Sequence, residues 1–156
     1  MRPSCHTVLL GLALTVSGGL LSAHNARAQE EPEHAVAYRQ GIMVAMAWNI
    51  GPLGKMIKGD IQFDDARCAL LASRASILAP MALEGFTLDT AQTKSRAKAE
   101  LWQHQDDFKK RMQDLASASA ELAKVAARGD HAQTRLLFSD TVKICKACHD
   151  EYQVKR

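Results

Sequence analysis

The amino-acid sequence predicts an all-α protein, an antiparallel up-down four-helix bundle. The composition favours helices, because alanine, leucine, lysine and glutamine are abundant, aromatic residues make up only 5% of the chain, and β-branched runs suited to strands are missing. Apolar residues recur at helical spacing in four long segments. Glycine and proline separate these segments and leave one longer connection beside the shorter turns, as expected for neighbouring antiparallel helices.

The first helix is expected from about Pro32 to Lys58. Proline suits the first turn of a helix, and Glu33 favours the positive end of the helix dipole. Gly51-Pro52 interrupts the segment, so we expect a kink there, with a break into two helices as the alternative. The apolar residues that repeat every seven positions are Val36, Met43, Ile50 and Ile57.

The second helix is expected from about Asp64 to Met81. Asp64 or Asp65 can cap its N-terminus, and Pro80 and Gly85 are expected to end it. The stretch from 84 to 96 that follows is rich in small and polar residues, which predicts the longest loop of the bundle. The buried face of this helix is marked by Leu71, Ala75 and Leu78.

The third helix is expected from about Ala97 to Arg128, with Leu101, Phe108, Met112, Leu115, Leu122 and Val125 along its apolar stripe. Gly129 is a natural helix stop, and Asp130 is a natural cap for a fourth helix from about His131 to Val154. The residues of this last helix that we expect to point inward are Leu136, Leu137, Val142, Cys145, Cys148, His149 and Tyr152.

The N-terminus has the features of an export signal. Arg2 gives a positive start, Val8 to Leu21 form a short apolar core, and Ala26-Arg27-Ala28 is a small-residue cleavage site. We therefore expect residues 1–28 to be a signal peptide cleaved near Ala28 and residues 29–156 to form one domain in a bacterial periplasm, without stable membrane insertion. An uncleaved anchor is the alternative.

The segment Cys145-Lys146-Ala147-Cys148-His149 is the strongest functional signal. The pattern C-x-x-C-H is typical of covalent c-type haem attachment, in which both thiols bind the porphyrin and the imidazole becomes an axial iron ligand. On a helix, these side chains share one face because they lie three and four positions apart. A thioredoxin-like redox pair and a zinc site are the alternatives, but strands and a second ligand pair are missing. We expect one covalently attached haem c per chain.

Beyond this motif, the chain resembles the class II c-type cytochromes, the cytochrome c prime family. The resemblance rests on the haem motif near the C-terminus within Cys145–Tyr152, on Ala35–Gln40 in the first helix, and on Glu100-Leu101-Trp102 with Phe108 in the third. It implies a four-helix bundle with His149 as the proximal iron ligand. It also implies that a residue of the first helix faces the sixth position of the iron, which is a bulky apolar residue in gas-binding members and methionine in low-spin relatives.

By the register of Tyr38-Arg39-Gln40, Met43 takes that place. We expect Met43 to be the distal iron ligand, with Met46 as a competitor and a core-filling role as the plain alternative. Histidine and methionine ligation makes a low-spin haem that suits single-electron transfer, so we expect a periplasmic electron carrier and not an enzyme. The alternative is a five-coordinate, high-spin cytochrome c prime that binds nitric oxide or carbon monoxide.

Other residues have weaker assignments. Arg39 is a candidate partner for a haem propionate, and a solvated surface arginine is the alternative. Cys68 is expected to be a buried thiol. Many gas-binding members have a basic residue four positions after the haem histidine, whereas this chain has Gln153. The cations beside the long loop, expected as propionate partners, a docking rim or solvated surface, are Lys94, Arg96 and Lys98.

Charge and composition limit the partners. The mature chain is nearly neutral, because Arg2 and Arg27 belong to the predicted signal peptide. We see no basic footprint for nucleic acid and no polybasic membrane patch. Redox proteins of the periplasm are the expected partners. The resemblance is compatible with a monomer or with a homodimer that pairs through the first helices.

Overall fold

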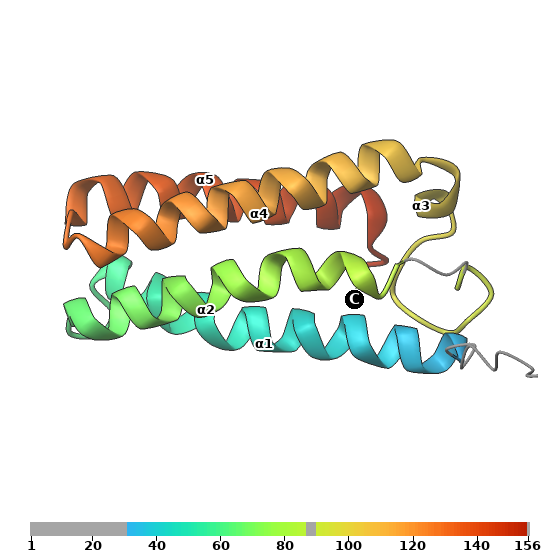
Figure 1. Cartoon of the computed structure of the whole chain (residues 1–156), viewed down its shortest axis with the longest axis horizontal. Helices are drawn as coiled ribbons and strands as arrows, with labels where there is room; N and C mark the ends of the chain where they lie inside the picture. The colour runs from blue at the N-terminus through green and yellow to red at the C-terminus, as the bar shows by residue number, and fades with distance from the viewer. Residues whose placement is uncertain (1–30, 87–89, 156) are drawn as a thin grey trace, which may run out of the picture.

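The computed structural model describes residues 31–86 and 90–155, and the predicted signal peptide and its cleavage site near Ala28 lie outside the described residues. The bounds of the predicted domain, 29–156, therefore stay a prediction. Five helices follow one another along the described chain (Figure 1), namely α1 (Pro32–Lys58), α2 (Asp65–Glu84), α3 (Glu100–Gln103), α4 (Gln105–Ala127) and α5 (His131–Tyr152).

The four long helices lie side by side and form the predicted all-α bundle. Figure 1 shows α1 and α2 in one layer and α4 and α5 in the other, with the short α3 at one end. The helix α2 packs against both α1 and α4, and α4 packs against α5. By length and hydropathy alone α2 is apolar enough to span a membrane, but a core helix of a bundle meets the same test. The fold class predicted from the sequence is confirmed.

The first helix has the predicted bounds. Pro32 occupies its first turn, and Gly59 ends it in the left-handed conformation with φ 83°. Pro52 lies inside α1, and the helix continues through it to Lys58. The break into two helices that we considered for Gly51-Pro52 therefore does not occur.

The second helix is longer than predicted. Asp64 caps it by accepting a hydrogen bond from the Arg67 backbone N–H at 2.7 Å, but Pro80 does not end it, and α2 continues to Glu84. The physical reason is that Pro80 is exposed, so the backbone carbonyl that loses its helical partner at this point can be solvated. The extra turn brings Gly85 against α1.

The predicted third helix is two helices. His104 has φ −120° and ψ 43°, which ends α3 and starts α4, and the two acidic residues Asp106 and Asp107 favour the N-terminus of the new helix. The predicted apolar stripe nevertheless crosses the break unchanged. All six of its members are buried, namely Leu101, Phe108, Met112, Leu115, Leu122 and Val125.

The inward face of α5 was predicted incorrectly at three positions. Leu136 is 61% exposed, Val142 is 38% exposed, and His149 is also exposed. The reason is register, because the stripe that faces the bundle advances by four, three, four, three and four residues and misses these positions. Its members, buried or half-buried, are Thr134, Phe138, Thr141, Cys145, Cys148 and Tyr152.

The core divides into adjoining apolar clusters along the bundle. One end contains Leu53, Leu71, Leu122 and the buried thiol Cys68, as predicted for that cysteine. At this end, α1 and α5 approach one another where the Phe138 ring lies against Gly54. The other end of the bundle is closed by α3 and by the segments on either side of it. This second end contains the haem motif.

Candidate functional site

The three residues of the haem motif lie on the last two turns of α5. Cys145 and Cys148 are half-buried free thiols, and His149 is more exposed. Because α5 is helical throughout this stretch, the thiols lie one turn apart on the same face, as the sequence predicts. The two sulfurs therefore face the bundle at the end that α3 closes, and the more exposed His149 directly follows the second of them on α5.

Each thiol packs against its own apolar cluster. Cys148 and Met43 both pack against the cluster that we call the Cys148 cluster, whose buried members are Ala82, Leu101, Phe108, Met112 and Tyr152. Cys145 packs against a second cluster, whose buried members are Met46, Ala75, Ala79 and Leu115. The two methionines that the sequence singled out on α1 are thus placed near different cysteines. Met46 is fully packed in the core, whereas Met43 is half-buried.

Arg39 lies at the edge of the Cys148 cluster and is only 3% exposed. Its guanidinium lies 4.5 Å from the centre of the Phe86 ring and donates to the Gly85 carbonyl at 3.2 Å, to the Thr90 hydroxyl, and to the Ser95 hydroxyl at 3.1 Å. Burial lowers the pKa of Arg39. All of these partners are neutral, and within residues 31–86 and 90–155 no carboxylate pairs with it. The solvated surface arginine that we considered is excluded.

Neither cysteine of the haem motif has a lowered pKa. Burial raises the pKa of both Cys145 and Cys148, so these side chains do not have the lowered pKa that makes the reactive thiolate of a redox pair. Partial desolvation of the ring lowers the pKa of His149, and the nearby charge of Arg96 lowers it further. The imidazole is therefore neutral at neutral pH, which is the form that binds a metal.

The end of α5 is tied to α4 beside this site. The Tyr152 hydroxyl donates to the Asp107 carboxylate at 2.6 Å, and Arg111 donates to the same carboxylate at 2.6 Å. Burial and this hydrogen bond raise the pKa of Tyr152 to about 12. The phenol therefore stays protonated over the physiological range and holds α5 against α4 three residues after His149.

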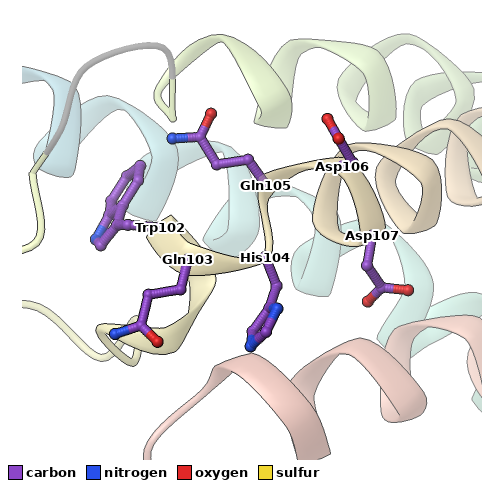
Figure 2. Close-up of a pocket in the computed structure, with 6 residues that line it drawn as sticks. All are labelled: Trp102, Gln103, His104, Gln105, Asp106 and Asp107. Carbon is purple, nitrogen blue, oxygen red and sulfur yellow. The ribbon is translucent and has the colours of Figure 1, made fainter.

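Figure 2 shows the junction of α3 and α4 above this tie, where a hollow is lined by the six residues from Trp102 to Asp107. His104 and Asp107 point toward α5, whereas Trp102 lies on the other side of the junction. The hollow includes none of the three motif residues. It marks where the short α3 folds over the end of the bundle.

The residues at this end fit a haem. Two thiols one turn apart and a neighbouring neutral imidazole match the covalent and axial bonds of haem c. Apolar side chains around both thiols suit a porphyrin, and among the described residues no carboxylate balances the buried charge of Arg39, which suits a ligand that carries carboxylates. The zinc alternative is not supported, because in the described part of the chain no three His, Cys, Asp or Glu side chains gather to hold a bare metal ion.

Comparison with known proteins decides the family. The sequence model of the family described as Cytochrome C' matches residues 34–153, which is most of the chain. The chain belongs to the cytochrome c prime family. It therefore carries one covalently attached haem c, and the resemblance on which we based the class II assignment is confirmed.

Individual members of the cytochrome c prime family agree over nearly their full length. The protein is 31% identical to the cytochrome c prime of Halomonas halodenitrificans over 80% of this chain and 99% of that protein. It is similar to the solved cytochrome c prime of Shewanella frigidimarina, with 34% identity, a TM-score of 0.78 and coverage of 81% and 98%. A nitrosyl complex of a variant from Alcaligenes xylosoxidans gives 30% identity, a TM-score of 0.75 and coverage of 80% and 98%.

These findings overturn one expectation. The low-spin electron carrier with histidine and methionine ligands is wrong, because relatives such as those of Halomonas halodenitrificans and Alcaligenes xylosoxydans are cytochromes c prime and the solved neighbours include nitric oxide complexes. The sequence correctly placed Met43 on the face of α1 that packs toward Cys148. A methionine on that face can pack there without binding the iron. The Met43 side chain already has apolar neighbours in the Cys148 cluster, and we do not retain it as a ligand.

Some contacts at this end were not predicted from the sequence. Arg96 and Lys98, which we considered as propionate partners, a docking rim or solvated surface, also donate to backbone carbonyls at and just after the end of α5. The pair of Asp107 and Tyr152 was missed as well. A carboxylate 45 positions from a tyrosine gives no local signal, because only the packing of α4 on α5 brings the two together.

Proposed function

We propose that this protein binds a small neutral gas, nitric oxide or carbon monoxide, at a five-coordinate haem c. The observation that carries the proposal is the similarity to cytochromes c prime along almost their whole length, one of them solved as a nitrosyl complex. When bound, the haem would supply an iron that His149 would ligate and that can bind a diatomic gas. We propose that Cys145 and Cys148 attach the porphyrin.

Met43 is the residue of α1 that we expect to face the proposed gas-binding site. Its neighbours in the Cys148 cluster are apolar, among them Ile42, Leu83 and Phe86. An apolar lining favours an uncharged diatomic ligand over an anion or water, because burying a charge without a partner is costly. It also lacks the acid or base that turnover of a bound ligand requires, so we propose a binding protein and not an enzyme.

Arg39 is the proposed partner of a haem propionate. The acceptors of this buried guanidinium within residues 31–86 and 90–155 are neutral, and a carboxylate of the ligand would supply a compensating charge. The same side chain fastens α1 to the loop between α2 and α3. Arg39 would therefore link binding of the haem to its contacts with Thr90 and Ser95.

We also propose a periplasmic location and a homodimer. The predicted signal peptide supports a periplasmic location, where redox proteins would keep the haem reduced.

The segment 41–54 of α1 has no charged residue, and its outer face exposes Val44 and Trp48. On α2, Leu70 and Ile77 are also exposed. Since an exposed apolar face of this kind favours association, we propose that it pairs with a second copy of the chain.

An absorption spectrum of the purified haem protein tests the proposed function. We expect a high-spin ferric spectrum at neutral pH and an immediate shift when carbon monoxide is added to the reduced protein. The Met43→Leu variant is the matched control, because it removes the sulfur and keeps an apolar side chain of similar size. A reduced protein with sharp, split low-spin bands that ignores carbon monoxide would contradict the proposal.

A further inference from the structure

The last turn of α5 is clamped by the segment that leads into α3. The Lys98 backbone N–H donates to the Tyr152 carbonyl at 2.9 Å, and the Val154 N–H donates to the Arg96 carbonyl at 2.8 Å. These bonds form a short antiparallel bridge. The Lys98 ammonium adds a bond to the Glu151 carbonyl at 2.6 Å. Two cations therefore face the C-terminal end of the helix, where the helix dipole favours positive charge.

The guanidinium of Arg96 is fixed in this clamp. Its Nη2 donates to the Val154 carbonyl at 3.0 Å and to the side-chain oxygen of Gln153 at 3.3 Å. Gln153, which directly follows α5, is uncharged. The positive charge beside it is that of Arg96, which belongs to the loop before α3. The side chain has two acceptors and a backbone held by the bridge, so the position of its charge is well defined.

This charge lies close enough to His149 to act on it. The Gln153 side chain accepts a hydrogen bond from Arg96, and the Gln153 backbone N–H donates to the His149 carbonyl at 3.1 Å. The guanidinium is therefore held at the residue one helical turn after His149. The carboxylate of Asp150, next to His149, carries the opposite charge and is itself paired with Lys146, which weakens its field.

We propose that Arg96 tunes the haem electrostatically through its fixed place beside His149. A positive charge beside the iron's ligand disfavours the ferric state, which carries one more positive charge than the ferrous state. Arg96 thereby raises the midpoint potential and keeps the haem in the reduced form that binds carbon monoxide. This inference rests on the proposed function only in its last step, because the change in potential occurs whether or not a gas binds.

The midpoint potential of the haem protein tests the proposal. We expect Arg96→Gln to lower the potential relative to the unmodified protein and Arg96→Lys to leave it nearly unchanged, because lysine keeps the charge. The difference should shrink as salt is added, because Arg96 is exposed and its field is screened. Lys124→Gln is the matched control, since it removes an exposed cation from α4 at the opposite end of the bundle and should not change the potential.

Two outcomes overturn the inference. One is an Arg96→Gln protein with the same potential as the unmodified protein at low salt. The other is an Arg96→Lys protein whose potential falls as far as that of Arg96→Gln, which would assign the effect to hydrogen-bond geometry and not to charge. Arg96→Met provides a second neutral replacement if the glutamine variant fails to retain haem.

The proposed function and this inference fail separately. A low-spin spectrum that ignores carbon monoxide removes the proposed function, whereas the potentials of the Arg96 variants still report on the charge. A high-spin, gas-binding protein whose potential does not respond to Arg96 removes only the inference.

Discussion

At the residue scale, the two cysteines of the haem motif differ from the third described cysteine in their surroundings. Cys145 and Cys148 lie half-buried on one face of α5, whereas Cys68 is buried in the core at the other end of the bundle. We expect the double variant Cys145→Ser with Cys148→Ser to lose covalent haem, because a serine hydroxyl cannot form the thioether. Mass spectrometry under denaturing conditions measures this directly.

Cys68→Ser is the control for that experiment. It should keep the covalent haem mass, although a hydroxyl in place of a buried thiol lowers the free energy of unfolding by about 1–3 kcal/mol. Loss of haem from this variant alone, with the double variant still loaded, would contradict the assignment of the attachment site.

Met43 provides the second test at this scale. If the sixth position of the iron is open, Met43→Ala leaves the ferric spectrum high-spin and speeds carbon monoxide binding, because the change only removes bulk from the Cys148 cluster. Stopped-flow absorbance measures the rate. Met46→Ala, at a fully packed core position, should instead lower the free energy of unfolding by about 2–5 kcal/mol with little effect on binding. A change of Met43→Ala from low spin to high spin would restore the methionine ligand.

These residues also show where sequence reasoning ends. The motif of Cys145, Cys148 and His149 could be predicted because its chemistry lies within five consecutive residues on one helix. The state of the sixth position could not, because a methionine on the correct face of α1 fits both ligation and packing. Arg39 lies between these cases, since its register pointed to the haem but its burial depends on Thr90 and Ser95 of a distant loop.

At the element scale, the extra turn of α2 brings its end into close contact with α1. A Cβ added to Gly85 would lie 2.7 Å from the Arg39 Cβ and 2.9 Å from the Ala35 carbonyl oxygen. Because both neighbours belong to or adjoin the α1 backbone, they cannot move aside cheaply. We therefore expect Gly85→Ala to lower the free energy of unfolding by about 1–3 kcal/mol, measured by denaturant titration of the haem protein.

Gly41→Ala is the matched control on the same pair of helices. An added Cβ there meets nothing within 4 Å, and alanine favours a helix over glycine by about 0.5–1 kcal/mol, so this variant should be slightly more stable. Equal effects of the two substitutions would show that the approach of Gly85 to α1 is not tight in solution.

Helix ends that depend on nearby residues could be predicted, whereas those that depend on distant contacts could not. The ends of α1 and the start of α2 could be predicted, because Pro32, Gly59 and Asp64 act on their own helices. The break at His104 could not, since no glycine or proline marks it and the apolar stripe continues across it. The face of α5 was misjudged at Leu136 for a related reason, because an apolar side chain is no proof of burial.

At the scale of the whole molecule, several large apolar side chains on the described part of α1 and α2 are exposed. Val44 is 69% exposed and Trp48 is 77% exposed one turn further along α1. Neither belongs to the clusters that hold the haem motif, so forming the haem site does not require them. These two residues, with the exposed Leu70 and Ile77 of α2, are the ones that we propose for pairing of two chains.

Charge placed on this face should separate the copies. We expect the double variant Val44→Glu with Trp48→Glu to sediment as a monomer at concentrations where the unmodified protein sediments as a dimer, because pairing would bury like charges against one another. Leu136→Glu is the matched control, since Leu136 is 61% exposed on α5 and should not affect the assembly. Both variants should retain haem and the spectrum of the unmodified protein, because their side chains lie outside the haem site. A monomeric unmodified protein, or a dimer that only the α5 substitution disrupts, would place the interface elsewhere or remove it.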